Sequence, residues 1–313
     1  MSLLRKIARA LAALSIALGG NALARAPESG AEAPAPVSSP AAEAERRAAP
    51  ALWKVSDEDT TIYLFGTVHA LPADLEWMDD RISGALHASD VLITEIPMDK
   101  EGAAALDPAV LKMAILPAGS SLRSMMDAED RAAYEKAMTS LALPVAAFDQ
   151  LEPWYAALML STMPLMRDGY GPESGVEAVL EKAFGAERPR GALETVEYQL
   201  GLFDTLPVDA QLDYLRQVSD NVDELKPKLD AMIAAWLAGD ADHLAELIND
   251  DETDPALVER LLTQRNRNWA EWIVKRMERS GTVFIAVGAG HLAGDESVQA
   301  ILCKDGIKAM RVQ

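Results

Sequence analysis

Two short apolar runs, one near each end of the chain, close on the same polar pattern. The first is Gly66-x-x-His69, within YLFGTVHA, and the second is Gly288-x-x-His291, within VFIAVGAGHLA. The chain has only four histidines, and two unrelated core histidines would rarely share one frame of strand-like run, glycine, two residues and histidine. The repeat predicts that the two ends of the chain meet at one polar site and that the residues between them build its walls.

The first 50 residues are expected to lie outside the folded unit. A basic start leads into a short apolar stretch and then to small residues at Ala22, Ala24 and Ala26, the pattern of a secretory signal peptide. That stretch is too short for a comfortable membrane span, so no stable insertion is expected after cleavage. Residues 27–50 are mostly Ala, Pro, Glu and Ser, which cannot build a core. We expect a signal peptide over 1–26, a disordered linker over 27–50, one domain over 51–313, and a periplasmic or secreted protein. The alternative is an uncleaved N-terminal anchor.

The charge balance narrows the classes of partner. The formal net charge is −20, and removal of residues 1–26 takes away four basic residues and no acidic one, which leaves −24. Such a surface repels nucleic acid and anionic lipid at long range. We expect a neutral or cationic partner, such as a peptide or another small substrate, and no nucleic acid.

Strand-like segments lie at both ends of the chain, and helical patterns fill the middle. Short apolar runs predict strands over residues 52–55, 61–65, 91–96, 192–196, 282–287 and 307–312. Amphipathic or apolar stretches separated by Pro and Gly predict helices over residues 77–88, 103–114, 128–141, 154–166, 176–184, 208–218, 222–238 and 241–248. We expect an α/β (α+β mixed) fold, with a mixed sheet built from N- and C-terminal strands and a mostly helical middle.

A last long helix is predicted between Asp254, a helix cap, and Gly281, a stop signal. Its apolar stripe includes Trp269, and Arg265 falls on the same stripe one turn earlier, next to Asn266. A guanidinium that faces a core needs an acidic partner or an anionic ligand, because its desolvation is costly. Arg265 and Asn266 are therefore candidates to hold a substrate carboxylate or a developing oxyanion.

Three candidate site residues, His69, Glu95 and His291, follow the ends of predicted strands, where ligands gather in open α/β sheets. Two imidazoles and a carboxylate are an ordinary ligand set for a divalent ion such as Mn, Co or Zn. Without a metal, the same residues fit proton transfer, with one histidine as base and Glu95 as the group that orients it. No HExxH, GxSxG or nucleotide-binding loop occurs, which disfavours the enzyme classes that use them.

A set of short motifs resembles the TraB/GumN family, which includes the pheromone-shutdown protein PrgY and the Tiki proteases that cleave Wnt proteins. The motifs are LWKV at 52–55, YLFGTVH at 63–69, ASDVL at 88–92 with Glu95, LET at 193–195 with Gln199, Arg265-Asn266, and VGAGHL at 287–292 with Gly294. They extend over most of residues 52–313, and their order makes the set specific although each piece is short. The resemblance implies a fold related to the erythromycin-esterase and ChaN-like proteins, a mixed sheet with surrounding helices.

The same resemblance implies roles for individual residues. His69 and His291 match the two histidines proposed as metal ligands or catalytic residues in Tiki-type members, and Glu95 matches the glutamate after the first motif. Glu177 and Glu194 match two further acidic positions. Each of these two is an additional candidate ligand, or else a helix cap or a partner of the late-helix arginine.

Together these features predict an exported, metal-dependent hydrolase with peptides as its preferred substrates. A divalent ion would lower the pKa of a bound water, and Arg265 and Asn266, which match the family's polar pair, would position the substrate. The predicted catalytic set is His69, Glu95, Arg265, Asn266 and His291. The alternative is a periplasmic binding or accessory protein without catalysis, for a peptide signal, haem or a polysaccharide-export partner. A third possibility is a scaffold without a ligand.

Overall fold

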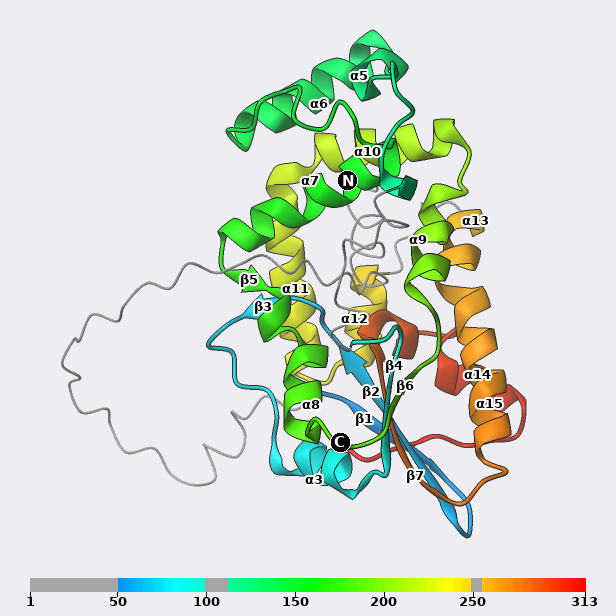
Figure 1. The fold of residues 1–313 in the computed structure, drawn as a ribbon. Coiled ribbons are helices and arrows are strands. Elements are labelled where there is room, and N and C mark those ends of the chain that lie inside the picture. The colour runs from blue at the N-terminus through cyan, green and yellow to red at the C-terminus, as the bar shows by residue number, and fades with distance from the viewer. Residues whose placement is uncertain (1–49, 99–111, 249–254) are drawn as a thin grey trace, which may run out of the picture.

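The computed structural model describes residues 50–98, 112–248 and 255–313. The expected signal peptide and nearly all of the expected linker lie outside these residues, as does most of the helix expected over residues 103–114. A mixed six-stranded sheet forms the centre of the fold (Figure 1). Its strand order is β6 (Arg190–Ala192), β4 (Val91–Thr94), β7 (Gly281–Gly288), β2 (Thr60–Thr67), β1 (Leu52–Ser56) and β8 (Met310–Arg311).

The two ends of the chain meet in the middle of this sheet. β1 and β2 form the expected antiparallel hairpin, and β7, from the C-terminal part of the chain, runs parallel to both β2 and β4. Gly66 pairs with Val287, and Thr67 pairs with Gly288. The two motif glycines therefore lie one position apart on neighbouring parallel strands, and the predicted meeting of the two motifs is confirmed.

Helices cover both faces of the sheet because its strand residues alternate between two apolar cores. Ile62, Leu64 and Ile285 point into a core shared with α14 (Gln264–Arg276) and α15 (Val298–Lys304). Phe65 and Phe284 point to the opposite face. That face packs against α3 (Asp80–Ala88), α8 (Val176–Phe184), α11 (Leu225–Leu237) and α12 (Ala241–Ile248). Side chains of successive strand residues point to opposite faces of the sheet, so a strand that is covered on both faces must be apolar on both.

The helical middle of the chain builds a third core above the sheet (Figure 1). Its helices are α5 (Leu122–Met125), α6 (Ala128–Ser140), α7 (Pro153–Arg167), α9 (Val196–Asp204) and α10 (Val208–Asp220). Large apolar and aromatic side chains fill this core, among them Trp154, Phe203 and Leu215. The expected combination of a mixed sheet and a mostly helical middle is confirmed.

Several elements differ from the sequence prediction. The strand expected over residues 192–196 ends at Ala192, and α9 begins at Val196 because Thr195 caps it through a hydrogen bond from the N–H of Tyr198 at 3.2 Å. A small sheet of β3 (Leu71–Pro72) and β5 (Tyr170–Gly171) was not expected. The remaining short helical segments are η1 (Pro172–Ser174), η2 (Val222–Glu224), α13 (Pro255–Val258), η3 (Glu259–Thr263) and η4 (Ala289–Leu292).

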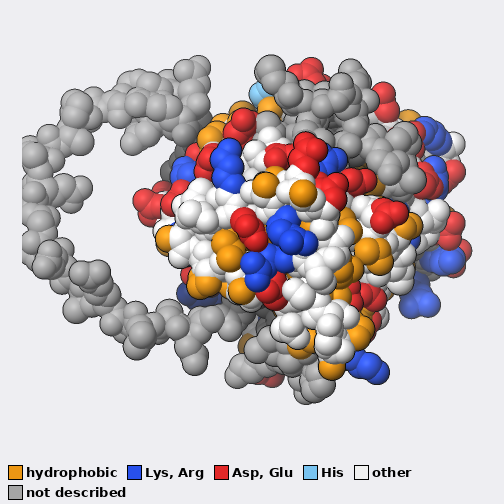
Figure 2. All heavy atoms as spheres, turned by 90° about the horizontal axis from the view of Figure 1, so that it is seen from above, with side chains coloured by type: hydrophobic (Ala, Val, Ile, Leu, Met, Phe, Trp, Pro, Cys, Tyr) orange, Lys and Arg blue, Asp and Glu red, His pale blue; other side chains and the backbone are white. Residues whose placement is uncertain are grey.

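The surface above the helical layer is mixed in character. Figure 2 shows acidic, basic and hydrophobic side chains interspersed over the described part of this face. Within the helical layer, Arg123 of α5 pairs with Asp149 at 2.7 Å and with Glu135 of α6 at 3.2 Å. Within the described ranges, no helix combines the length and the apolar character needed to cross a membrane.

Candidate functional site

Four parallel strands bring polar residues to one edge of the sheet. β2, β7, β4 and β6 run in the same direction, so their carboxyl ends lie together. The next polar residues along the chain are His69 after β2, Glu95 after β4, Glu194 after β6 and His291 after β7. The N–H of Glu194 donates to the carbonyl of Glu95 at 2.7 Å, which continues the pairing of β4 and β6 into this region.

Arg265 joins two of these carboxylates. Its side chain is fully buried, and Nη2 donates to Oε2 of Glu95 at 2.7 Å and to Oε2 of Glu194 at 2.8 Å. Burial alone would lower the pKa of Arg265, but Glu95 and Glu194 raise it above its usual value. The guanidinium therefore stays charged, and its predicted acidic partner is this pair of glutamates.

Gln199, Trp269 and a backbone amide complete the hydrogen bonding of the two carboxylates. Nε2 of Gln199 donates to Oε2 of Glu95 at 2.8 Å and to Oε2 of Glu194 at 2.9 Å. Nε1 of Trp269 donates to Oε1 of Glu194 at 3.0 Å, and the N–H of Gly288 donates to Oε1 of Glu95 at 2.6 Å. Each carboxylate oxygen thus accepts at least one hydrogen bond, as burial of two carboxylates requires.

The partners of His291 define its tautomer. Nδ1 lies 2.5 Å from Oδ1 of Asn266, whose Nδ2 donates to the carbonyl of Glu296 at 2.7 Å. The amide orientation is therefore fixed, Oδ1 must accept, and Nδ1 of His291 must carry the proton. The other ring nitrogen, Nε2, lies 3.0 Å from Nη1 of Arg265, which can only donate. His291 is thus a neutral imidazole whose Nε2 accepts from a guanidinium.

The surroundings of His291 keep it neutral. Burial and the positive charge of Arg265, with that of His69 when it is protonated, hold the pKa of His291 well below its usual value. Its ring also packs on Trp269, with the two ring centroids 4.3 Å apart.

His69 forms a second polar pair beside this network. Its Nδ1 lies 2.5 Å from Oε1 of Glu177, and Oγ1 of Thr67 donates to the same oxygen at 2.5 Å. Burial opposes the charge of Glu177, but the charge of His69 when it is protonated and the hydrogen bonds from His69 and Thr67 outweigh it and lower the pKa of Glu177. Glu177 is therefore ionised at neutral pH. Its side chain is 6% exposed, whereas 14% of the His69 side chain reaches solvent.

A close backbone contact holds His69 against the start of α8. The N–H of Val176 donates to the carbonyl of Val68 at 3.0 Å. A Cβ added to Gly175 would lie 2.1 Å from the carbonyl oxygen of His69. Only glycine permits this approach without movement of the backbone. Gly175 and the first turn of α8 therefore place His69 and Glu177 as one unit.

The helix that supplies Arg265 and Asn266 starts with an irregular turn. The π-helical turn η3 lies between α13 and α14, and Nη1 of Arg265 donates to the carbonyl of Leu261 within it at 3.1 Å. Single π turns inside helices recur at functional sites because they change which side chains face inward. Here two successive residues, Arg265 and Asn266, are both buried and both bonded to the network.

The residues expected to bind a divalent ion are paired within the protein. Nε2 of His291 and Oε2 of Glu95 both face the guanidinium of Arg265, and Nδ1 of His69 faces Glu177. Across residues 50–98, 112–248 and 255–313, no three His, Cys, Asp or Glu side chains are grouped so as to hold a metal ion. In this arrangement the donors do not fit a divalent cation, because Arg265 already places a positive charge between them. Metal binding stays a prediction.

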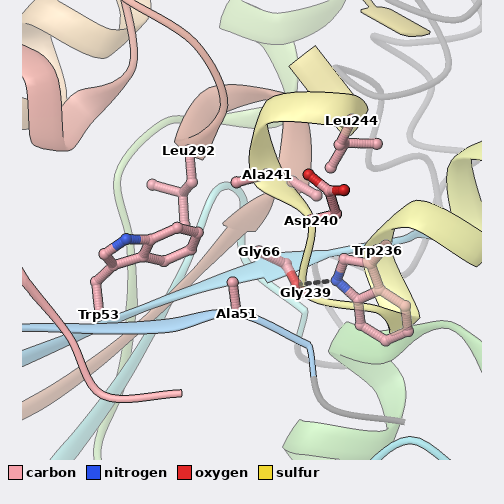
Figure 3. Close-up of a pocket in the computed structure, with 10 residues that line it drawn as sticks. Ala51, Trp53, Gly66, Trp236, Gly239, Asp240, Ala241, Leu244 and Leu292 are labelled. Carbon is pink, nitrogen blue, oxygen red and sulfur yellow. Dashed lines mark hydrogen bonds between the residues drawn. The ribbon is translucent and has the colours of Figure 1, made fainter. Parts of the chain in front are cut away.

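A pocket lies beside Gly66 of the first motif (Figure 3). Trp53, Trp236, Leu244 and Leu292 line it around Gly66, whose carbonyl accepts a hydrogen bond from Nε1 of Trp236 at 2.8 Å. No side chain of the polar network contributes to its lining. The candidate chemistry therefore belongs to the polar edge of the sheet rather than to this apolar pocket.

The predicted site residues fall into two groups. Glu95, Glu194, Arg265, Asn266 and His291 share one network, and His69 pairs with Glu177. The sequence did not predict which histidine Glu95 would orient. The oxygens of Glu95 bond Arg265, Gln199 and Gly288, and its Oε1 lies 3.9 Å from Nε2 of His291. The carboxylate that holds His69 is Glu177, since Gly175 lets α8 dock directly on the His69 backbone.

Three participating residues had no predicted role. Thr67 lies inside the first motif, and Gln199 lies five residues after Glu194. Both residues therefore belong to the motifs, but the sequence did not indicate what they do. The apolar stripe assigns Trp269 to the core. An indole N–H one turn after a core-facing arginine could have indicated that Trp269 donates to the same acidic group, because a buried tryptophan usually needs an acceptor.

The fold and these two groups define a mixed α/β protein with a buried Arg–His–Glu network at the carboxyl edge of its sheet. The model of the TraB/PrgY/gumN family matches residues 51–311. The chain therefore belongs to the TraB/PrgY/gumN family. It is also similar to an uncharacterized protein of Treponema pallidum (strain Nichols), with 21% identity over 269 residues that cover 80% of each chain. No solved structure matches the chain.

Proposed function

We propose that this protein is an exported hydrolase that acts on peptides, with His69 as the base that activates water. The observation that carries the proposal is the contact between His69 and the buried, ionised carboxylate of Glu177 at 2.5 Å. His69 is partly exposed, while its partner and the neighbouring network are buried. General base catalysis requires a proton acceptor within hydrogen-bond reach of the attacking water, and His69 is exposed enough for a water to approach it.

The two ring nitrogens of His69 have different tasks. Nδ1–H donates to Glu177, which directs Nε2 to act as the proton acceptor. As the oxygen of a water attacks a carbonyl carbon of the substrate, Nε2 takes the water proton, and the Glu177 carboxylate stabilises the imidazolium that forms. The imidazolium then returns the proton to the peptide nitrogen as the C–N bond breaks, which releases the amine and the carboxylic acid. An oriented base of this kind contributes roughly 10²–10⁴-fold to the rate.

In this proposal the Arg265 network supports the site rather than contacting the substrate. The donors of Arg265 point at Glu95, Glu194, His291 and the carbonyl of Leu261. This supporting role for Arg265 differs from the expectation that Arg265 holds a substrate carboxylate. Arg265 would act through His291 and Glu95, whose positions it fixes.

The substrate class and the location rest on the sequence. The paired histidine motifs resemble those of the Tiki proteases, and the net charge of −20 favours neutral or cationic substrates over nucleic acids. The basic start and apolar stretch of residues 1–26 support export. Fractionation of cells that express the full chain tests the location, and a protein confined to the cytoplasm would contradict it.

The activity can be tested by incubating the purified protein with a diverse peptide library and identifying products by mass spectrometry. The wild type is expected to cleave a subset of the peptides, and His69→Gln is expected to lose this cleavage. His243→Gln is the matched control, because His243 forms an exposed pair with Glu246 at 3.3 Å. Absence of cleavage by the wild type, or equal cleavage by both variants, would contradict the proposal. Binding of peptides without cleavage would instead favour the accessory-protein alternative.

A further inference from the structure

One acceptor in the buried network receives no hydrogen bond from any residue that the structure describes. Nε2 of Gln199 donates to Glu95 and to Glu194, so two carboxylates fix the orientation of the amide and leave Oε1 as its other end. Oε1 is buried and receives no hydrogen bond from the described residues, and Gln199 as a whole is 2% exposed. A buried carbonyl oxygen in this state calls for a donor from a ligand or a water molecule.

The same place carries an excess of negative charge. Glu95 and Glu194 contribute two negative charges when ionised and Arg265 contributes one positive charge, so this group has a net charge of −1. The neighbouring pair of His69 and Glu177 adds nothing when His69 is protonated and a further negative charge when it is neutral. In either state the surroundings of Gln199 favour a cation over a neutral or anionic group.

We propose that Oε1 of Gln199 binds a primary ammonium group of the substrate, which the negative charge of Glu95 and Glu194 favours. Such a group supplies both the missing donor and the missing positive charge, and a hydrogen bond from a charged donor is stronger than one from a neutral amide. On a peptide, the ammonium belongs either to the amino terminus or to a lysine side chain. This inference rests on the proposed function, which places the substrate beside His69.

Two other occupants fit less well. A water molecule would supply a donor to Oε1 but would leave the charge uncompensated. A divalent metal ion would find a single neutral oxygen on Gln199, whereas such ions take several oxygen ligands. The side chain of Glu194 is only 5% exposed, so an ammonium group reaches Oε1 of Gln199 only when the surrounding side chains move.

Calorimetric titration with three probes tests the proposal without requiring turnover. The probes are alanyl-alanine amide, its N-acetylated twin, and N-acetyl-lysine amide. The full chain should bind alanyl-alanine amide at least roughly tenfold more tightly than the acetylated twin, as loss of a charged hydrogen bond predicts. If a lysine side chain is the natural donor, N-acetyl-lysine amide will instead bind more tightly than the acetylated twin. Either pattern supports an ammonium site and identifies its source.

A matched pair of variants then assigns the site to Gln199. Gln199→Met removes the acceptor and should weaken binding of the preferred amine by roughly tenfold or more. Gln211→Met is the control, because Gln211 is also a buried helical glutamine. Its Nε2 donates to the carbonyls of Asp204 at 3.1 Å and Leu206 at 3.0 Å, and its Oε1 accepts from the N–H of Trp154 at 3.4 Å. This variant should bind the amine as the wild type does.

The proposal is overturned if none of the probes binds, if the amines bind no better than the acetylated twin, or if Gln199→Met binds as the wild type does. A crystal structure grown with the preferred amine that shows only a water at Oε1 would also overturn it. If Gln199→Met does not fold, the comparison of the probes on the wild type still decides. Because binding is measured directly, loss of the hydrolase proposal would leave this result standing, and the reverse also holds.

Discussion

Nη1 of Arg265 lies 3.0 Å from Nε2 of His291, so two basic side chains meet as donor and acceptor in the buried network. The contact is possible because His291 is neutral and presents a lone pair. Another nitrogen of the same guanidinium, Nη2, donates to the carboxylates of Glu95 and Glu194. One side chain thereby fixes a histidine from the C-terminal motif and a glutamate from the N-terminal part of the chain.

Replacement of Arg265 should therefore destabilise the whole fold. Arg265→Met leaves Glu95 and Glu194 buried without a counter-charge, and we expect a loss of about 3–5 kcal/mol in the free energy of unfolding, measured by urea titration. Arg216→Met is the control, because Arg216 bonds Asp130 at 3.2 Å on a side chain that is 37% exposed. This control should change stability by less than about 1 kcal/mol. Equal losses in the two variants would show that the buried network contributes no more than a surface pair.

Stability should depend on pH through His291. The unfolded chain takes up a proton at the ordinary histidine pKa of about 6.5, whereas the folded protein resists protonation because the pKa of His291 is held well below that value. The contribution of the neutral imidazole is thus complete above about pH 6.5 and is lost as the pH falls below it, by up to about 1.4 kcal/mol per pH unit.

Urea titrations between about pH 7 and pH 5 check this sign. His291→Gln cannot take up a proton, so the wild type should lose more stability than this variant as the pH falls. The lowered pKa of Glu177 does not interfere, because its contribution is lost only below the unfolded value of about 4.5. Parallel pH profiles for the two proteins would contradict the neutral, buried state of His291.

Gly175 should be the most sensitive glycine near His69. Gly175→Ala places a Cβ against the His69 carbonyl, so the backbone must move, and we expect loss of both stability and peptide cleavage. Gly84→Ala is the control, because Gly84 lies in α3 and an added Cβ meets nothing within 4 Å. It should be stabilising by roughly 0.5–1 kcal/mol. Thermal unfolding and cleavage assays on both variants separate the two effects.

Removal of metal ions should leave the cleavage of peptides intact if His69 acts as the base. The donors of His291 and Glu95 face Arg265, and a divalent ion would have to displace this guanidinium. Dialysis against EDTA followed by metal analysis and a cleavage assay makes the test. Loss of activity that Mn, Co or Zn restores would show instead that the network rearranges around an ion, as the sequence-based hypothesis expects.

The meeting of the two motifs was predictable because it depends on local pattern. Each motif ends a short apolar run, and parallel pairing of β2 with β7 then places Gly66 and Gly288 one position apart. The acidic partnership of Arg265 was predictable for a similar reason, since a charged residue on an apolar helix stripe must be compensated where it is buried.

The different surroundings of the two histidines were not predictable from their shared frame. After Gly288 the chain turns into η4 and buries His291, whereas after Thr67 it leads to β3 and leaves His69 partly exposed. The pairing of His69 with Glu177 depends on how α8 docks through Gly175, more than 100 residues away in the sequence. Such a contact follows from tertiary packing, which no local pattern encodes.

Peptide cleavage by a double-mutant cycle of His69→Gln and Glu177→Gln tests most directly whether these two residues act as one catalytic unit. Residues that act together are not additive, so each single variant should lose roughly 10²-fold or more in kcat/KM. The double variant should then be no slower than the worse single variant. Effects that multiply in the double variant, or single variants as active as the wild type, would contradict the proposed role of the pair.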